Sequence, residues 1–563
     1  MRSITRTAAL IMALLMATAL TGCANNNEGS ETTPTQQASV TEGSGSAEAT
    51  AATDESVSAE EVTGEFTMTT ADGAFSQDGS KYTVTAAGTY SLRGALEGQI
   101  VVAAGEADEV VLELNGTTIS NSADSPIKIL SADKVEISAK KGTGNVINDA
   151  RSEKTADSDQ GDGAIYAKTD LKLKGSGTLV VNAGYNNGVQ TSKDLTVQKL
   201  SLKVTAVNNA LKGNDSITVK SGTVVLISTK GDGMETSSTD TNKSGGTRGD
   251  VTLLGGSIAV YAAGDGIQAA HDFTMQTGEE GYSPNVAVFT GSYSGYTADS
   301  AATTSYKGVK ADNAISVSAG VISVSSYDDG LHANYGTTFD SGETGLGSVS
   351  VTGGSIIMAV YSPEGKTAGG HGGPGGHGGW GGQQAVSGAD GIHADGELNI
   401  SGGSISIDSA YEGLEANVIN VSGGTTVIAA NDDGINACKG QASPLINVTG
   451  GILDVSVPAN GDVDGIDSNG SYTQSGGIVI TRGPNSEMAA AIDAESSVSV
   501  TGGTLIVLGY GRLQIGSSVS QTSLSLHGEG SHSITAGGVS YSFTNAYSYG
   551  QTLCVSDTEV SGS

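Results

Sequence analysis

A short pattern of one aliphatic, one polar and one small residue recurs twelve times between residues 165 and 494 of this 563-residue chain. Uninterrupted copies begin 21 to 24 residues apart, and we interpret the longer gaps as insertions into the same unit. A fixed period of this length indicates a stack of units, each of which buries its apolar face only against its neighbours. The aliphatic positions are Ile165, Val189, Leu211, Met234, Ile267, Val309, Leu331, Ile392, Leu414, Ile435, Ile466 and Ile492.

One uninterrupted unit shows how such a copy folds. Residues 391–394, 398–400 and 405–407 each alternate apolar and polar side chains, which is typical of short strands with one buried face. Gly402-Gly403 separates the second and third strands, and the same glycine pair recurs in later units. The sequence therefore predicts an all-β, single-stranded parallel β-helix with three short strands per coil. We expect it to run from about residue 64 to 510, with a β cap at 511–563.

The N-terminal residues have the features of a secretory signal. Arg2 and Arg6 precede an apolar run that is too short to span a bilayer and ends at Leu20-Thr21-Gly22-Cys23. This ending resembles the bacterial lipobox, which implies cleavage before Cys23 and lipidation of its thiol. We expect residues 1–23 to be the signal, residues 24–63 to be a flexible tether, and the protein to be anchored outside the cell membrane.

Charge and cysteine content limit the function. The net charge of −33 excludes binding to nucleic acid through phosphate contacts, and Cys438 and Cys554 are too many coils apart for a disulfide. We expect both to be free thiols, and the protein to be a monomer that meets the membrane only through its anchor.

Acidic residues precede the repeat glycine in seven units. Stacked coils lie about 4.8 Å apart, so these carboxylates would repel one another unless a cation such as calcium lay between them. The alternative is turn chemistry, in which an aspartate bonds its own turn. The candidate calcium ligands are Asp232, Asp265, Asp329, Asp390, Glu412, Asp433 and Asp464.

A second column of polar residues follows the aliphatic position and is expected to face outward. It forms either a solvated surface or a ligand site. Insertions at 237–250, 335–348, 438–445, 291–305 and 362–388 flank the same sheet and are placed to wall a groove over it. The candidate ligand-binding residues are Lys310, His332, His393, Glu415, Asn436, Asp467 and, on a loop, Trp380.

The loop around Trp380 is rich in glycine and histidine. Residues 369–382 contain His371 and His377, which could bind a transition metal or belong to a flexible loop. Trp380, the one tryptophan of the chain, could stack on a sugar ring.

Several segments carry a family resemblance. Residues 82–90, residues 186–190 and the Asp-Gly-Ile coils with Ser-Gly-Gly-Ser turns resemble a family of secreted bacterial carbohydrate-binding β-helix proteins, first catalogued as a domain of unknown function. The resemblance covers about residues 64 to 510. It implies a right-handed β-helix, bound calcium, and binding of plant-type or other acidic polysaccharides.

Three functions remain open at this point. The first is a cell-surface lipoprotein that binds polysaccharide with the help of calcium. The second is a calcium-dependent lyase of the pectate-lyase-like fold, with Lys310 as the candidate base, and the third is a structural or adhesive stalk. The acidic column and the clustered insertions favour a ligand, and the absence of arginine from the outward column disfavours a lyase.

Overall fold

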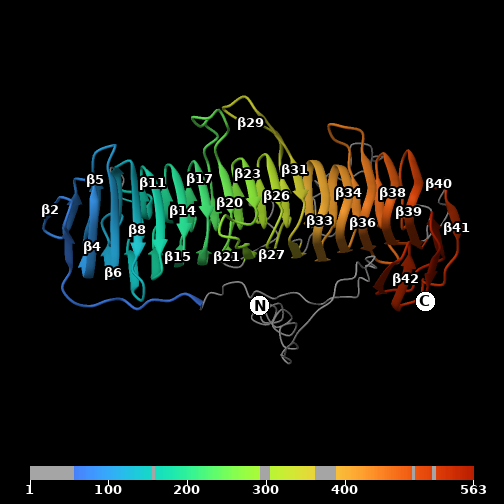
Figure 1. Ribbon diagram of the computed structural model, residues 1–563, viewed down its shortest axis with the longest axis horizontal. Helices are drawn as coiled ribbons and strands as arrows, with labels where there is room; N and C mark the ends of the chain where they lie inside the picture. Colours follow the sequence, from blue (N-terminus) through green and yellow to red (C-terminus); the bar gives the residue numbers. More distant parts are fainter. Residues whose placement is uncertain (1–55, 155–158, 292–304, 362–387, 485–488, 510–514) are drawn as a thin grey trace, which may run out of the picture. The chain divides into compact units, whose positions relative to one another are not determined.

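The repeat unit folds into strands that pair with the equivalent strands of the next unit. The computed structural model describes residues 56–154, 159–291, 305–361, 388–484, 489–509 and 515–563. The chain divides into two units, Met1–Ser39 and Val40–Ser563, and every described strand belongs to the second. Forty strands form one mostly parallel hydrogen-bonded network, and no α-helix occurs in the described ranges. This is an all-β, solenoid-like stack (Figure 1).

Strands in the middle of the stack form three columns. From β10 to β25 each strand pairs in parallel with the one three places later in sequence, as β10 does with β13. Further along the interval is longer, so that β26 pairs with β31 and β27 with β32. The first column contains β10 (Gly163–Ala167), β13 (Asn187–Thr191), β16 (Leu211–Gly213), β19 (Met234–Glu235), β22 (Ile267–Ala269), β25 (Val309–Ala311), β28 (Leu331–Ala333), β35 (Ile435–Ala437) and β37 (Ile466–Ser468). The second contains β11 (Asp170–Gly175), β14 (Asp194–Gln198), β17 (Ser216–Val219), β20 (Asp250–Leu253), β23 (Asp272–Met275), β26 (Ala314–Val317) and β31 (Ser348–Val351). The third contains β12 (Thr178–Ala183), β15 (Leu200–Ala206), β18 (Gly222–Ser228), β21 (Ser257–Ala262), β24 (Asn285–Thr290), β27 (Val321–Ser326) and β32 (Ser355–Val360).

Towards the C-terminal end of the stack, single long strands replace these short ones and extend across two or three columns. They are β33 (Ile392–Ser409), β34 (Leu414–Ala429), β36 (Leu445–Ser456), β38 (Ser471–Arg482) and β39 (Ser497–Leu508). The predicted Gly-Gly turn bends them: Gly403 has φ +82° and Gly424 has φ +78°, values that favour glycine.

The core is the stacked aliphatic column that the repeat predicted. Ile392 pairs in register with Leu414, which pairs with Ile435, and all three side chains are fully buried. The repeat glycine has a packing role here, because a Cβ at Gly391 would lie 2.6 Å from the Gly413 carbonyl oxygen. The twelfth copy differs from the prediction: Ile492 is buried but lies outside any strand.

The first coils and the C-terminal end contain antiparallel pairs. β1 pairs antiparallel with β4, and β44 pairs antiparallel with β39. The first strands are β1 (Thr67–Thr70), β2 (Phe75–Asp78), β3 (Lys81–Val84), β4 (Gly88–Glu97), β5 (Gln99–Ala103), β6 (Glu109–Asn121), β7 (Ile127–Ser131), β8 (Lys134–Ala139) and β9 (Gly144–Asp149). The last are β40 (Ile515–Ser517), β41 (Ser520–Thr522), β42 (Gly530–Ala536), β43 (Val539–Asn545), β44 (Thr552–Ser556) and β45 (Val560–Gly562).

A buried polar cluster joins the C-terminal strands to the stack. The Arg482 guanidinium donates to Asp454 Oδ1 at 2.5 Å and to Asn545 Oδ1 at 2.7 Å. Tyr541 donates to the other oxygen of Asp454 at 2.8 Å. The Arg482 side chain is almost fully buried, so losing these hydrogen bonds would leave a buried charge without partners. The bonds therefore hold β43 against β36 and β38.

The segment before the first strand lies against the stack, which differs from the expectation of a flexible tether through residue 63. Val57 is 1% exposed and packs with Val225 and Ala259 of the third column. Further along, the Val62 N–H donates to Thr118 Oγ1 at 2.7 Å. The apolar outer positions of β18 and β21 explain this contact, because they leave a surface that Val57 covers.

In the described residues no helix is long and apolar enough to cross a membrane. Cys438 and Cys554 are both free thiols, in agreement with the prediction. Burial, and then the neighbouring Glu415, raise the pKa of Cys438 to about 12, so this thiol is un-ionised at neutral pH.

Candidate functional site

The acidic residues before the repeat glycine form a hydrogen-bonded ladder along one edge of the first column. In all of these residues except Glu412, one carboxylate oxygen accepts the backbone N–H of the equivalent residue in the next coil, as Asp433 Oδ1 does from Asp464 at 2.8 Å. The Asp390 N–H donates in the same way to Asp329 Oδ1 at 2.9 Å. The carboxylates thus bond the next coil, a contact that the turn-chemistry alternative did not include. Other steps of the ladder are Asp265 to Asp232, Lys307 to Asp265 and Glu412 to Asp390.

A lysine that the sequence analysis did not single out occupies one step of this ladder. Lys307 precedes Gly308, and its ammonium group lies 2.8 Å from Asp329 Oδ2 and 2.9 Å from Asp328 Oδ1. Burial alone would raise the pKa of Asp329, but Lys307 and the hydrogen bond from His332 hold it well below its usual range. At this coil an ammonium group therefore balances the buried carboxylate. Lys307's place directly before a repeat glycine was the signal in the sequence.

The outward column is in the predicted register, with Lys310 beside His332, His332 beside His393, and His393 beside Glu415. Its last two members differ from the expected solvated face. Asn436 is 7% exposed and Asp467 is 8% exposed. These two polar groups therefore need partners other than bulk water.

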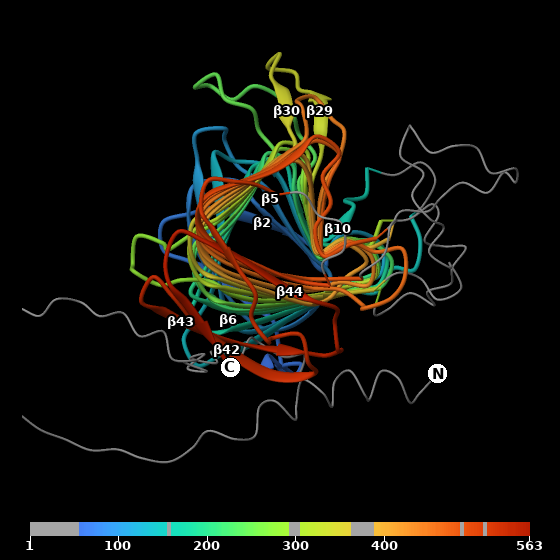
Figure 2. The same cartoon turned by 90° about the vertical axis from the view of Figure 1, so that its right-hand side faces the viewer.

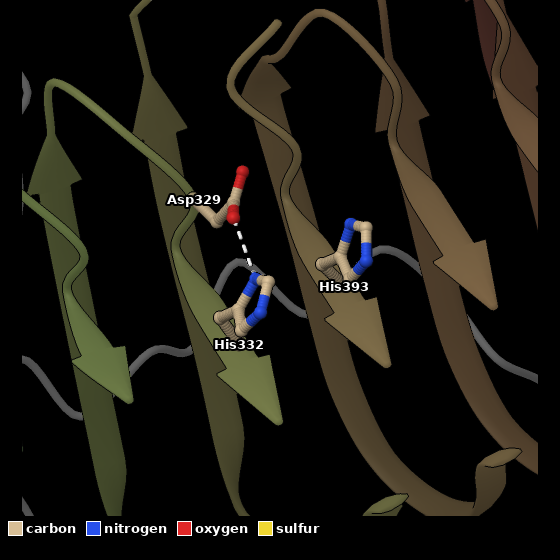
Figure 3. A group of neighbouring side chains, drawn as sticks. All are labelled: Asp329, His332 and His393. Carbon is tan, nitrogen blue, oxygen red and sulfur yellow. Dashed lines mark hydrogen bonds and ion pairs between the residues drawn. The ribbon is translucent and has the colours of Figure 1, made fainter. Parts of the chain in front are cut away.

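Two histidines of the column stand at the centre of a polar cluster (Figure 3). The rings of His332 and His393 are nearly parallel, with centroids 4.5 Å apart. His332 Nδ1 lies 2.7 Å from Asp329 Oδ2, and His393 Nδ1 lies 3.0 Å from both Asp390 Oδ2 and Glu415 Oε2. Ladder and column thus meet at these rings, which places the predicted metal ligands and the predicted sugar-contacting residues in one cluster.

The electrostatics of the cluster show an excess of negative charge. Burial lowers the pKa of His393, but hydrogen bonds to Asp390, Asp395 and Glu415 raise it well above its ordinary value. Burial and then nearby carboxylates raise the pKa of Asp390 well above its ordinary value as well. Protons therefore supply part of the positive charge that these groups require.

In the part of the ladder that follows this cluster, the candidate metal-ligand atoms are all oxygens. Burial, followed by the carboxylates of Asp390, Glu415 and Asp433, raises the pKa of Glu412 well above its ordinary value. Burial raises the pKa of Asp464 to about 8, with Asp433 and Asp467 adding to the shift. These residues form a second segment of the same edge, the oxygen-only stretch, in which carboxylates of the described chain gather without a lysine or histidine between them.

Asn436 lies within this stretch. Its amide nitrogen donates to Glu412 Oε2 at 3.1 Å. Its buried carbonyl oxygen has no hydrogen-bond partner among the described residues. A buried acceptor without a donor costs stability. A bound cation would satisfy this oxygen, so its lack of a partner points to a cation site.

At the other end of the ladder, the predicted ligands lie near a lysine. Burial and then Asp265 raise the pKa of Asp232 to about 8, while Lys310 opposes the shift. Lys310 also acts on Asp265, whose pKa burial raises. This end therefore has a positive side chain of its own.

The insertions at 237–250 and 335–348 pack against each other beside the first column. Thr247 Oγ1 lies 2.7 Å from Ser341 Oγ, and Phe339 packs edge-on against the ring of His271. The second insertion contains β29 (Tyr335–Thr338) and β30 (Thr344–Leu346), which project from the stack in Figure 2. His271, which the sequence analysis did not consider, also contacts Asp250 through Nδ1 at 2.8 Å.

Two aromatic pairs, one half-buried and one exposed, do not form a flat platform for sugar rings. Tyr261 and Phe289 stack with an interplanar angle of 8°, which turns their faces toward each other. Tyr327 and Tyr361 are tilted by 43°. A sugar-stacking site needs accessible ring faces, so these pairs are better explained as side-chain packing between coils.

Other predicted positions lie outside the described residues. These are the lipidation site Cys23, Trp380, and the glycine- and histidine-rich loop 369–382. Their predicted roles stay predictions.

Part of the chain is similar in sequence to known proteins. Residues 78–353 match the model of a family described as carbohydrate-binding domain-containing proteins. A carbohydrate-binding domain-containing protein of Acetivibrio thermocellus is 39% identical over 126 residues, which are 22% of this chain and 44% of that relative. The chain thus matches less than half the length of this relative.

A solved structure is also similar. It is described as a polysaccharide lyase-like protein from C. thermocellum, gadolinium derivative, and is 31% identical. The alignment covers 44% of this chain and 90% of that one, with a TM-score of 0.38.

Proposed function

We propose that this protein binds an acidic polysaccharide along the outer face of the first column, with calcium held by the oxygen-only stretch of the ladder. The finer fold assignment is part of the proposal: a right-handed helix of three strands per coil, where the number of strands is supported by the pairing of each strand from β10 to β25 with the third one after it. The match of residues 78–353 to carbohydrate-binding proteins supports the glycan. The proposed calcium site lies C-terminal to that match.

The observation that carries the calcium proposal is the Asn436 carbonyl oxygen, which is buried without a hydrogen-bond partner among the described residues. Calcium takes six to eight oxygen ligands and accepts irregular geometry. Glu412 accepts a hydrogen bond from Asn436, Asp467 is the neighbour of Asn436 in the next coil, and Asp433 and Asp464 bond to each other along the same edge. A bound cation would lower the pKa values of Glu412 and Asp464, which burial and then the neighbouring carboxylates raise.

This proposal assigns calcium to fewer residues than the seven acidic ligands predicted from the sequence. Asp329 is paired with Lys307, and Lys310 lowers the pKa of both Asp232 and Asp265. Calcium is therefore assigned to the C-terminal half of the ladder. There it would reverse the local sign of a chain with a net charge of −33 and leave coordination positions for the carboxylates of a uronate polymer.

The test is sedimentation of the protein with insoluble polygalacturonate in calcium and in chelator. We expect binding in calcium, loss of binding in chelator, and at least tenfold weaker binding for Asn436→Ala and for the double variant Asp464→Asn, Asp467→Asn. The exposed Asp78 of β2 supplies the matched control, Asp78→Asn. Binding that is unchanged by chelator and by the double variant would contradict the proposal. Release of unsaturated sugar products during the assay would identify the lyase alternative instead.

A further inference from the structure

Both ring nitrogens of His332 face oxygen acceptors. Nδ1 lies 2.7 Å from Asp329 Oδ2, and Nε2 lies 2.8 Å from Asn334 Oδ1. The amide orientation of Asn334 is fixed, because its nitrogen donates to Asp312 Oδ1 at 2.6 Å. Nε2 therefore carries a hydrogen, and Nδ1 is the ring nitrogen that faces the Asp329 carboxylate.

His393, one coil later, repeats the arrangement. Its Nδ1 lies 3.0 Å from Asp390 Oδ2 and 3.0 Å from Glu415 Oε2, and its Nε2 lies 3.1 Å from Asp395 Oδ1. Asp395 is held in turn, because its other oxygen accepts the Tyr335 N–H at 2.9 Å.

The two Nδ1 atoms thus face neighbouring carboxylate oxygens from two stacked rings, whose centroids lie 4.5 Å apart. A neutral imidazole that keeps its hydrogen on Nε2 has a free lone pair on Nδ1, and this is the form that binds a metal. A divalent cation beside the two Nδ1 atoms would be held by these lone pairs and by the carboxylates, whose negative charge it would offset.

We propose a binding site for a zinc-class divalent transition ion, formed by Nδ1 of His332 and Nδ1 of His393 with carboxylates from Asp390 and Glu415. Candidate ligand atoms of Asp329, His332 and His393 lie within 4.8 Å of one another, as do those of Asp390, His393 and Glu415. Imidazole nitrogen selects zinc and its neighbours over calcium, which prefers oxygen alone.

The groups behind the rings are arranged as a metal site requires. Metal-bound histidines usually donate the other ring N–H to a carboxylate or carbonyl oxygen, which fixes the tautomer and orients the ring. Asn334 Oδ1 and Asp395 Oδ1 occupy these positions. Both residues come two places after their histidine, Asn334 directly after β28 and Asp395 within the long strand β33, so the repeat itself supplies the second partner.

The proposal does not rest on polysaccharide or calcium binding, and its test keeps calcium in excess throughout. Chelator-stripped protein is titrated calorimetrically with ZnCl₂. We expect one tight zinc per chain, with affinity at least 100-fold weaker in His332→Gln and in His393→Gln. Asn334→Ala, which removes only an orienting group, should weaken binding 10- to 100-fold.

Control variants separate this site from other candidates. The loop variant His371→Gln, His377→Gln and the calcium-site variant Asn436→Ala should bind zinc as the unaltered protein does. If a ring variant does not fold, Asn334→Ala and the visible absorption of bound Co²⁺ still decide the outcome. Absence of tight zinc binding, or its loss in the loop variant alone, would overturn the proposal.

Discussion

The carboxylate of Asp433 accepts a hydrogen bond from the backbone N–H of Asp464, one coil further along the stack, at 2.8 Å. The same bond recurs between Asp329 and Asp390. The acidic ladder therefore links successive coils through hydrogen bonds and is also a candidate cation site. Substitutions that keep the oxygen acceptor but remove the charge can separate these two roles.

Asp433→Asn and Asp433→Leu should differ in the metal-free protein. Asparagine keeps the Oδ1 acceptor, whereas leucine leaves the Asp464 N–H buried without a partner, at a cost of about 1–3 kcal/mol. Urea unfolding in chelator measures the difference. In calcium, both variants should lose the metal-dependent rise in melting temperature. Equal stability of the two variants in chelator would show that the bond contributes nothing.

Stability without metal should fall as the pH rises from about 4 to 8. The pKa of Asp464 is about 8 in the folded protein, raised by burial and neighbouring carboxylates from its ordinary value of 3.8. Folding is thus favoured by protonation, fully below the unfolded pKa, and this contribution is lost as the pH passes through 8. Asp464→Asn should reduce the slope by at most about 1.4 kcal/mol per pH unit. Thermal melting at several pH values in chelator measures the slope, with Asp78→Asn as the control that leaves it unchanged.

Lys307→Met should destabilise the protein by about 3–5 kcal/mol, because it leaves the buried Asp329 carboxylate without its ammonium partner. The double variant Lys307→Met, Asp329→Asn should recover much of this loss, since asparagine can still accept the Asp390 N–H. Denaturant unfolding of the single and double variants forms the cycle. A double variant no more stable than Lys307→Met would contradict the pairing.

Cys23→Ser should release the protein from the membrane fraction into the medium or the soluble fraction, because a serine cannot carry the thioether-linked lipid. Fractionation of expressing cells followed by immunoblotting measures this, and Cys438→Ser is the matched control. Retention of the Cys23→Ser protein in membranes would refute the lipobox interpretation.

The sequence alone determined the stacking of the coils. The aliphatic column around Ile392, Leu414 and Ile435 could be predicted because a strand with period-two alternation has only one apolar face, and that face must be buried. The same register places Asp390 beside Glu412, and His332 beside His393. Repetition turns positions that are distant in sequence into neighbours at a known spacing.

Only the tertiary structure decided which atoms meet. The pairing of Lys307 with Asp329, the positions of Asn334 and Asp395 behind the histidine rings, and the burial of Asn436 depend on side-chain directions and loop paths. The packing of Val57 on the third column depends on where a non-repetitive segment returns to the surface. A repeat fixes the register of backbones, but the residue type at a polar position changes from coil to coil and its side-chain direction is set by local packing, so periodicity does not predict these contacts.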